Sequence, residues 1–175
     1  MTEYPFKKGD FVVYGASGVC QIEEVGELSF GAPAQCYYTL RPTSDQSSLT
    51  YVPCDNEMLT AKLRFVLSKE KVEETLRSHL DNAITWDNDR KTRLAKFHDI
   101  LSKGDPTALL SLIRCIMLKQ KELEKGNHRL SLSDAETLRG AMFSINSEFS
   151  FSLGIPKHSV AEYIRTHLAP EAVIE

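Results

Sequence analysis

The spacing of hydrophobic residues changes near residue 66, and this change restricts the possible folds of the 175-residue chain more than any other feature. Before it, short runs of β-branched and aromatic residues alternate with clusters of glycine, proline, serine and aspartate, a pattern typical of strands and tight turns. After it, apolar residues recur every three or four positions, which is typical of amphipathic helices. We therefore predict an α+β chain of two domains, residues 1–66 and 67–175.

The first domain is predicted to be a small, strongly bent sheet. Its four expected strands are residues 11–15, 19–25, 36–42 and 49–53. The stretch that follows, up to Ser68, is expected to be a connection between the domains. A sheet of this size cannot shield its own edges, so it favours the addition of a partner strand.

The second domain is predicted to contain about five helices. Ser68 is a candidate N-cap, Asp105-Pro106 has the residues of a helix start, and Ser133 to Glu136 has the form of a capping box. Three helices are expected to begin near these signals. Two more are expected, one within residues 84–105 and a short one from residue 159.

Trp86 is the only tryptophan, and it is followed by polar rather than apolar residues. One interpretation is that its ring is exposed at the start of a helix with a basic flank formed by Arg90, Arg93, Lys96 and Lys103. Cations neutralise phosphates and a flat ring can stack on bases, so the segment suits a nucleic acid. Alternatively, Trp86 fastens the helix start to a core and the charges form a solvated face. The residues alone leave both interpretations open.

Charge and hydropathy restrict the partners. The net charge is −3: residues 1–66 hold 5 Lys and Arg against 8 Asp and Glu, while residues 67–175 hold 16 of each kind. This balance argues against tight nonspecific DNA binding by the whole chain. No run approaches the roughly 20 apolar residues of a membrane span, and the first residues lack the apolar stretch of a secretory signal. We expect a cytoplasmic protein without a membrane partner.

The sequence contains little that predicts catalysis. The four cysteines have no Cys-x-x-Cys spacing, no histidine pair has the His-x-x-x-His spacing of a helical metal site, and phosphate-binding and nucleophile-elbow motifs are absent. We expect buried thiols, no metal, no cofactor, no small-molecule substrate and no catalytic residue. An interaction protein is the favoured class.

Three segments follow one another in register in the first domain: FKKGDFVVYGASGVCQIEEV, YYTLRP and TYVPCDNEMLTAKLR. They resemble the RNA-polymerase-interacting module of the CarD/CdnL family of bacterial transcription regulators, a module that also occurs in transcription-repair coupling factors. SKGDPTALLSLIR, LSLSDAETLRGAMFSINSEFSFSLGI and the Trp86 segment are similar to the family's helical carboxy-terminal domain.

The resemblance implies that the first domain is a Tudor-like barrel that lays an exposed strand against the polymerase β subunit. The residues implied in this contact are Leu28, Leu49, Thr50, Tyr51, Val52 and Pro53. Some relatives carry arginine at positions where this chain has Leu28 and Tyr51, so a more apolar contact face is expected. Proline at Thr50 or Val52 is expected to block strand addition by removing an outward N–H.

The resemblance also implies that the second domain contacts promoter DNA at the upstream edge of the melted region. Trp86 would be a wedge there, and the basic residues implied near phosphates are Arg90, Lys91, Arg93 and Lys96. Such a protein would stabilise the open complex without doing chemistry. The balanced charge of the second domain keeps an alternative open, a protein-only adaptor that binds polymerase without significant DNA contact.

Overall fold

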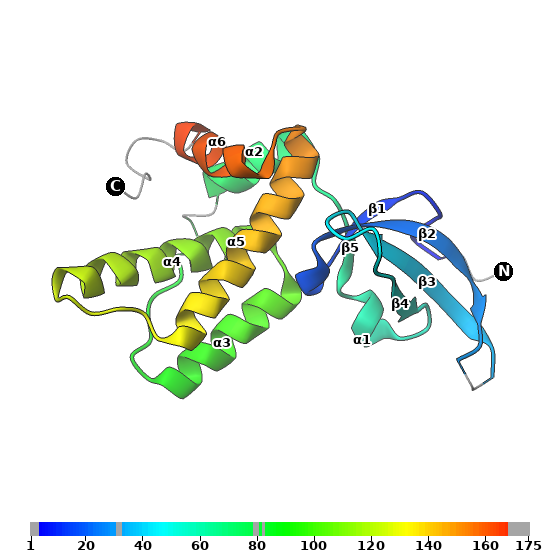
Figure 1. Cartoon of the computed structure of the whole chain (residues 1–175), viewed down its shortest axis with the longest axis horizontal. Helices are drawn as coiled ribbons and strands as arrows, with labels where there is room; N and C mark the ends of the chain where they lie inside the picture. Colours follow the sequence, from blue (N-terminus) through cyan, green and yellow to red (C-terminus); the bar gives the residue numbers. More distant parts are fainter. Residues whose placement is uncertain (1–3, 31–32, 79–80, 82, 168–175) are drawn as a thin grey trace. The chain divides into compact units, whose positions relative to one another are not determined.

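The computed structural model describes residues 4–30, 33–78, 81 and 83–167. The chain divides into two compact units, residues 1–66 and 67–175, and each has its own hydrophobic core. The first unit contains a sheet and the second consists of helices (Figure 1). The predicted α+β composition is confirmed.

Five antiparallel strands form the sheet in the part of the first unit that the structure describes. They are β1 (Phe11–Tyr14), β2 (Val19–Leu28), β3 (Gln35–Pro42), β4 (Thr50–Pro53) and β5 (Leu63–Phe65). Their order is β4-β3-β2-β1-β5, so β4 and β5 lie at the two ends of the ladder. The Tudor-like barrel stays a prediction, because the strand order describes a sheet with two ends.

The stretch predicted as a connection contains two elements, the single-turn helix α1 (Glu57–Thr60) and strand β5. A further short 3₁₀ turn, η1 (Gly15–Ser17), joins β1 to β2. Three residues are too few to show an alternating pattern, and β5 exists because β1, some 50 positions away, supplies its hydrogen-bonding partner. Local sequence therefore could not reveal β5.

One face of the sheet forms the core of the first unit. Val12, Cys20, Ile22, Leu40 and Val52 are completely buried on this face. Because side chains alternate along a strand, their neighbours in sequence point to the outer face of the sheet.

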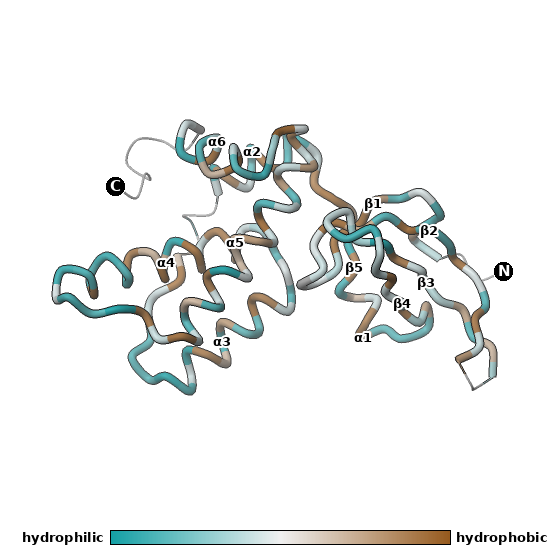
Figure 2. The backbone as a smooth tube through the Cα atoms, viewed as in Figure 1, coloured by the Kyte–Doolittle hydropathy of each residue, from teal (hydrophilic) through white to brown (hydrophobic). Residues whose placement is uncertain are grey.

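In the second unit, five α-helices are seen in the described part of the chain, as predicted. They are α2 (Lys69–Ser78), α3 (Arg90–Lys103), α4 (Pro106–Lys125), α5 (Leu132–Leu153) and α6 (Val160–His167), the last preceded by the 3₁₀ turn η2 (Lys157–Ser159). Figure 2 shows apolar residues along α4 and α5 and a hydrophilic C-terminal end of α4. The largest core side chains come from α2, α3, α4 and α5 and include Leu76, Phe97, Leu112, Ile116, Ile145 and Phe149.

Side-chain caps mark the starts of α3, α4 and α5. Asp89 accepts a hydrogen bond from the Thr92 N–H at 2.8 Å, and Asp105 accepts one from the Ala108 N–H at 2.8 Å. The N-cap of α5 is Ser131, whose hydroxyl accepts from the Asp134 N–H at 3.2 Å, so the predicted capping box at Ser133 is wrong. The earlier start is favoured because it places Asp134 in the first turn, where it also binds a buried arginine.

Two glycines in the second unit should respond in opposite ways to alanine. Gly104 ends α3 with φ 65°, so Gly104→Ala should lower the free energy of unfolding by about 1–2 kcal/mol. Gly140 lies inside α5, where a new Cβ would lie 3.8 Å from Leu101 Cδ2 without a clash, so Gly140→Ala should raise it by up to about 1 kcal/mol. Urea unfolding of both variants measures the difference. Shifts of equal sign would contradict the assigned helix end.

Candidate functional site

Strand β4 lies at one end of the strand order and presents one side of its backbone away from β3. The Cys54 N–H donates to the Cys36 carbonyl at 2.9 Å, in register with the pairs Val52↔Tyr38 and Thr50↔Leu40. In an antiparallel ladder, every second residue directs both its N–H and its C=O at the partner strand. The N–H and C=O groups of Tyr51 therefore point away from β3.

This register corrects the expected effect of proline. The N–H groups of Thr50 and Val52 face β3, so proline at either position would break the sheet itself. The outward donor belongs to Tyr51, whereas Pro53 has no N–H to offer. A partner strand on this side of β4 would therefore use the backbone of Tyr51.

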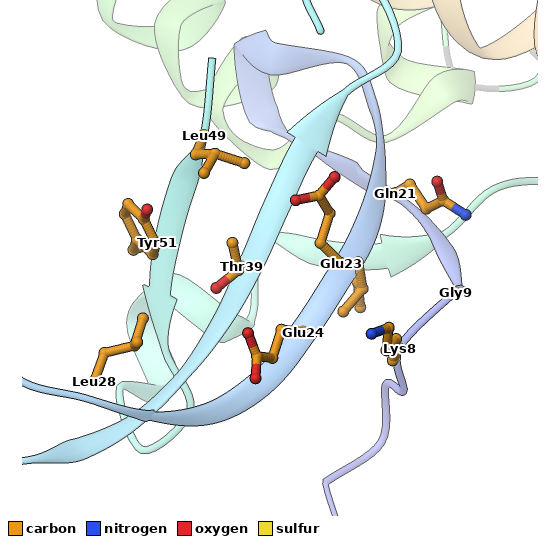
Figure 3. A pocket seen from close by; sticks show the side chains of 10 residues that line it. Lys8, Gly9, Gln21, Glu23, Glu24, Leu28, Thr39, Leu49 and Tyr51 are labelled. Carbon is orange, nitrogen blue, oxygen red and sulfur yellow. The ribbon is translucent and has the colours of Figure 1, made fainter. Parts of the chain in front are cut away.

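The outer face of the sheet beside β4 contains an open hollow of about 580 Å³. Figure 3 shows Leu28, Leu49 and Tyr51 along its β4 side, with Thr39 between β4 and β2. Lys8, Glu23 and Glu24 line other parts of the hollow. The apolar half is thus next to the edge strand, and the charged groups lie farther from it.

Two aromatic residues that sequence reasoning missed extend the apolar surface. The Phe30 ring lies with its centroid 5.0 Å from the Tyr51 ring and 5.3 Å from the Tyr37 ring. Phe30 is 59 % exposed and Tyr51 is 40 % exposed. Local sequence predicts only a turn at Phe30. The alternation along β3, which places Tyr37 on the same face as Thr39, was the available signal.

The charged side of the hollow is partly neutralised. Glu23 forms a bidentate ion pair with Arg41, in which Arg41 Nη2 lies 2.9 Å from Glu23 Oε2. Arg41 also donates a hydrogen bond to the Gln46 carbonyl. Hydrogen bonding from Arg41, against a smaller opposing effect of burial, lowers the pKa of Glu23. Glu24, which points to the outer face opposite Thr39, is exposed and adds negative charge.

The structure brings together only part of the predicted polymerase-contact set. Leu28, Leu49 and Tyr51 share the hollow. Val52 is completely buried in the core, so its side chain is not available to a partner. Thr50 and Pro53, the first and last residues of β4, are half-buried.

Trp86 is held in the helical unit by three neighbours. Its ring is half-buried against the core and meets Phe97 edge-on, with centroids 6.1 Å apart. The Arg93 guanidinium lies over the ring at 4.2 Å, and Lys119 Nζ lies 5.7 Å from the ring centre. Trp86 precedes α3 and does not begin it, so the expected position at the helix start is corrected by four residues.

Arg93 is buried, contrary to its expected place on a solvent-exposed flank. Its side chain is 7 % exposed, and Nε and Nη2 each lie 3.1 Å from an oxygen of Asp134, whose side chain is 2 % exposed. Nη1 donates to the Asp87 carbonyl at 2.8 Å. A phosphate contact by Arg93 would therefore require breaking this arrangement, because three of its nitrogens are already bound.

The ion pair has a defined pH dependence. Burial alone would raise the pKa of Asp134, but hydrogen bonds from Arg93 and Ser131 and the positive charges of Arg93 and Arg90 outweigh it, so the pKa lies below its usual value. The unfolded carboxyl has a pKa of about 3.9. The pair therefore contributes stability above about pH 4 and loses it as the pH falls through the folded pKa.

The other predicted DNA-contact residues are exposed. Arg90, Lys91 and Lys96 project from α3 into solvent, and Arg90 Nη2 donates to the Ser133 hydroxyl at 3.3 Å. Lys103, at the far end of α3, pairs with Asp99 at 2.7 Å. Arg90 and Lys96 of the predicted flank therefore remain exposed, together with Lys91.

The first unit, which contains the hollow, matches the model of a known family. Residues 6–66 match the family model described as the CarD-like/TRCF RID domain. The first unit is a CarD-like RID domain. Over residues 6–66 this match confirms the predicted family, and it classes the unit with RNA-polymerase-interacting domains. A comparison with curated proteins finds no match to the chain.

Over the described ranges, no group of three or more His, Cys, Asp or Glu side chains could hold a metal ion. Over the same ranges, no helix has the length and apolar character needed to cross a membrane.

Removing the Arg93 guanidinium should be far more costly than removing an exposed cation from the same helix. Arg93→Met leaves Asp134 buried without its partner and should lower the free energy of unfolding by about 3–5 kcal/mol. Lys91→Met, the matched control, should change it by less than about 0.5 kcal/mol. Chemical unfolding at pH 7 measures both. A destabilisation by Arg93→Met as small as that of the control would contradict a structural role.

Proposed function

We propose that this chain is a transcription regulator that binds the RNA polymerase β subunit by adding a polymerase strand to the outer edge of β4. The RID match supports polymerase as the partner. The proposed binding site rests on the backbone of Tyr51. Its N–H and C=O groups point away from β3, and β4 is the last strand in the order of the sheet. Strand addition uses backbone hydrogen bonds for affinity and alternate side chains for specificity.

The side chains around this edge indicate the chemistry of the polymerase segment. Leu28, Phe30, Leu49 and Tyr51 offer an apolar surface beside β4, so the added strand should place an apolar side chain over the hollow. A basic residue next to it would be attracted to Glu24. The resemblance implies arginine in some relatives at the positions of Leu28 and Tyr51, so this surface is proposed to be more apolar than theirs.

Backbone bonding at Tyr51 is the feature most directly tested. Each net hydrogen bond contributes about 0.5–1.5 kcal/mol, so removal of one bond together with the clash of a proline ring should reduce affinity by about tenfold or more. Proline is tolerated on edge strands where the N–H faces solvent, so the fold should survive.

Tyr51→Pro should therefore weaken binding to purified core RNA polymerase by at least about tenfold. Tyr51→Ala, which keeps the N–H and removes the exposed ring, is the matched control and should weaken it by a smaller factor. Fluorescence titration of labelled protein measures both, with thermal melting to confirm folding. Equal affinities of the two folded variants would show that the β4 edge is not the docking strand.

For the helical unit, we propose a contact with promoter DNA at the upstream edge of the bubble that stabilises the open complex. The support is the three exposed cations Arg90, Lys91 and Lys96 of α3, the helix that follows the partly exposed Trp86 in the sequence. In this arrangement Arg93 is a positioning residue: it stacks on Trp86 and fixes the preceding turn through the Asp87 carbonyl. Only the remaining open part of the indole is offered to DNA.

A second candidate function is a protein-only adaptor bound to polymerase. Two observations favour it. Arg93 is bound to Asp134, and the helical unit carries as many acidic as basic residues, 16 of each. Both lower the electrostatic attraction of this unit for a phosphate backbone.

Fork-junction DNA separates the two functions. If the unit binds DNA, Lys91→Ala and Lys96→Ala should weaken binding to polymerase on fork-junction DNA. The slope of log affinity against log salt concentration should fall by roughly one for each phosphate that is no longer neutralised. Lys103→Ala removes a cation already paired with Asp99, so as the control it should change neither the affinity nor the slope. For the adaptor, polymerase alone and fork-bound polymerase should bind the protein equally, with no response to any of the three substitutions.

A further inference from the structure

Two cysteines from different strands meet at the end of β4. Cys36 lies in β3 and Cys54 directly follows β4, and the Cys54 N–H donates to the Cys36 carbonyl at 2.9 Å. Their sulfur atoms are 3.1 Å apart, although 18 positions separate them in sequence. Both are free thiols and half-buried.

The backbone geometry at this position is compatible with a disulfide. Directly opposed residues in a hydrogen-bonded antiparallel pair have Cα atoms about 5.5 Å apart, within the range of about 4.4–6.8 Å seen in disulfides. The sulfur atoms need to approach by only about 1 Å to reach a bond length of about 2.05 Å. Side-chain rotation can supply this movement without separating the strands.

Hydrogen bonding distinguishes the two sulfur atoms. The Cys54 thiol donates to Cys36 Sγ, and the Tyr4 hydroxyl also hydrogen-bonds to Cys36, which is the main reason that the pKa of Tyr4 is raised to about 12. Burial, followed by the hydrogen bond with Cys36, raises the pKa of Cys54 to about 12. Cys36 accepts both hydrogen bonds, so it is the sulfur assigned to the first attack.

We propose that Cys36 and Cys54 form an oxidation site, closing to a reversible disulfide by exchange with a low-molecular-weight disulfide such as oxidised glutathione. The Cys36 thiolate attacks one sulfur of the small disulfide and releases a thiolate, which takes up a proton. Cys54 then loses its proton and attacks the Cys36 sulfur of the mixed disulfide, releasing the second small thiol. Two protein S–H bonds are exchanged for one S–S bond, and the small disulfide gains two electrons to become two thiols.

The other two cysteines do not share this arrangement. Cys20 is completely buried in the sheet core, and Cys115 is 5 % exposed in the helical core. Their burial keeps soluble oxidants away from both sulfur atoms.

The bond would close a loop that contains β4 and the whole turn from β3. It would hold the end of β4 against β3, one residue after Pro53, and limit fraying of this edge strand. Constraining the unfolded chain should also stabilise the first unit. This inference concerns the sheet alone and does not depend on which partner binds the β4 edge.

The test uses the full, reduced chain incubated with oxidised glutathione at graded ratios to reduced glutathione. Intact mass should fall by about 2 Da, and the thiols counted after denaturation should fall from four to two. Peptide mapping should locate the bond between Cys36 and Cys54. The oxidised form should melt about 5 °C or more above the reduced form, and dithiothreitol should reverse the shift.

Variants identify the pair and the order of attack. Cys54→Ser should stop at a glutathione adduct on Cys36, and Cys36→Ser should form no disulfide, whereas Cys115→Ser should oxidise like the natural chain. The proposal is overturned if the folded chain keeps four thiols at every ratio. It is also overturned if a bond forms only after denaturant is added, or if mapping places it on another pair.

Discussion

The register between β3 and β4 is the constraint on which the features of the first unit depend. Pairing Val52 with Tyr38 sends Val52 into the core and leaves the Tyr51 side chain on the outer face. The same register turns the Tyr51 backbone groups away from β3 and brings Cys36 opposite Cys54. A slip of one residue would exchange all of these roles, because the side-chain period of a strand is two. The outward backbone groups of Tyr51, the hollow and the cysteine pair are therefore consequences of one set of hydrogen bonds between β3 and β4.

In the helical unit, the corresponding interaction is the buried pair of Arg93 and Asp134. Two charges removed from water are costly, and the cost is offset here by two contacts between the side chains, a bond to the Asp87 carbonyl and the cap at Ser131. The pair joins α3 to the start of α5. The Arg93 guanidinium also covers one face of the Trp86 ring. The sequence suggested that this ring is either a wedge or a core contact, and in the structure it makes a core contact while part of it stays exposed.

The two units differ in the kind of surface they offer. The first has directional backbone groups, an exposed aromatic cluster and a net excess of acidic residues, features that favour a protein partner. The second carries 16 basic and 16 acidic residues and so has no net charge, and any contact it makes with DNA should be weak by itself. Attachment of the first unit to polymerase would raise the local concentration of the second, which is how a weak site becomes useful without tight binding of its own.

Sequence by itself determined the change from strands to helices, the start of α4 at Asp105-Pro106 and the family of residues 6–66, because these depend on local periodicity, capping and ordered motifs. It could not reveal β5, since its three residues depend on β1 for pairing. Nor could it predict that Arg93 is buried. A basic residue on a helix is buried only when the fold brings it a partner, here Asp134, which lies 41 positions away in the sequence. The outward N–H of Tyr51 and the contact of Cys36 with Cys54 likewise required the tertiary structure. They follow from which residue pairs with which across the sheet, and that choice is made by long-range packing rather than by any local pattern.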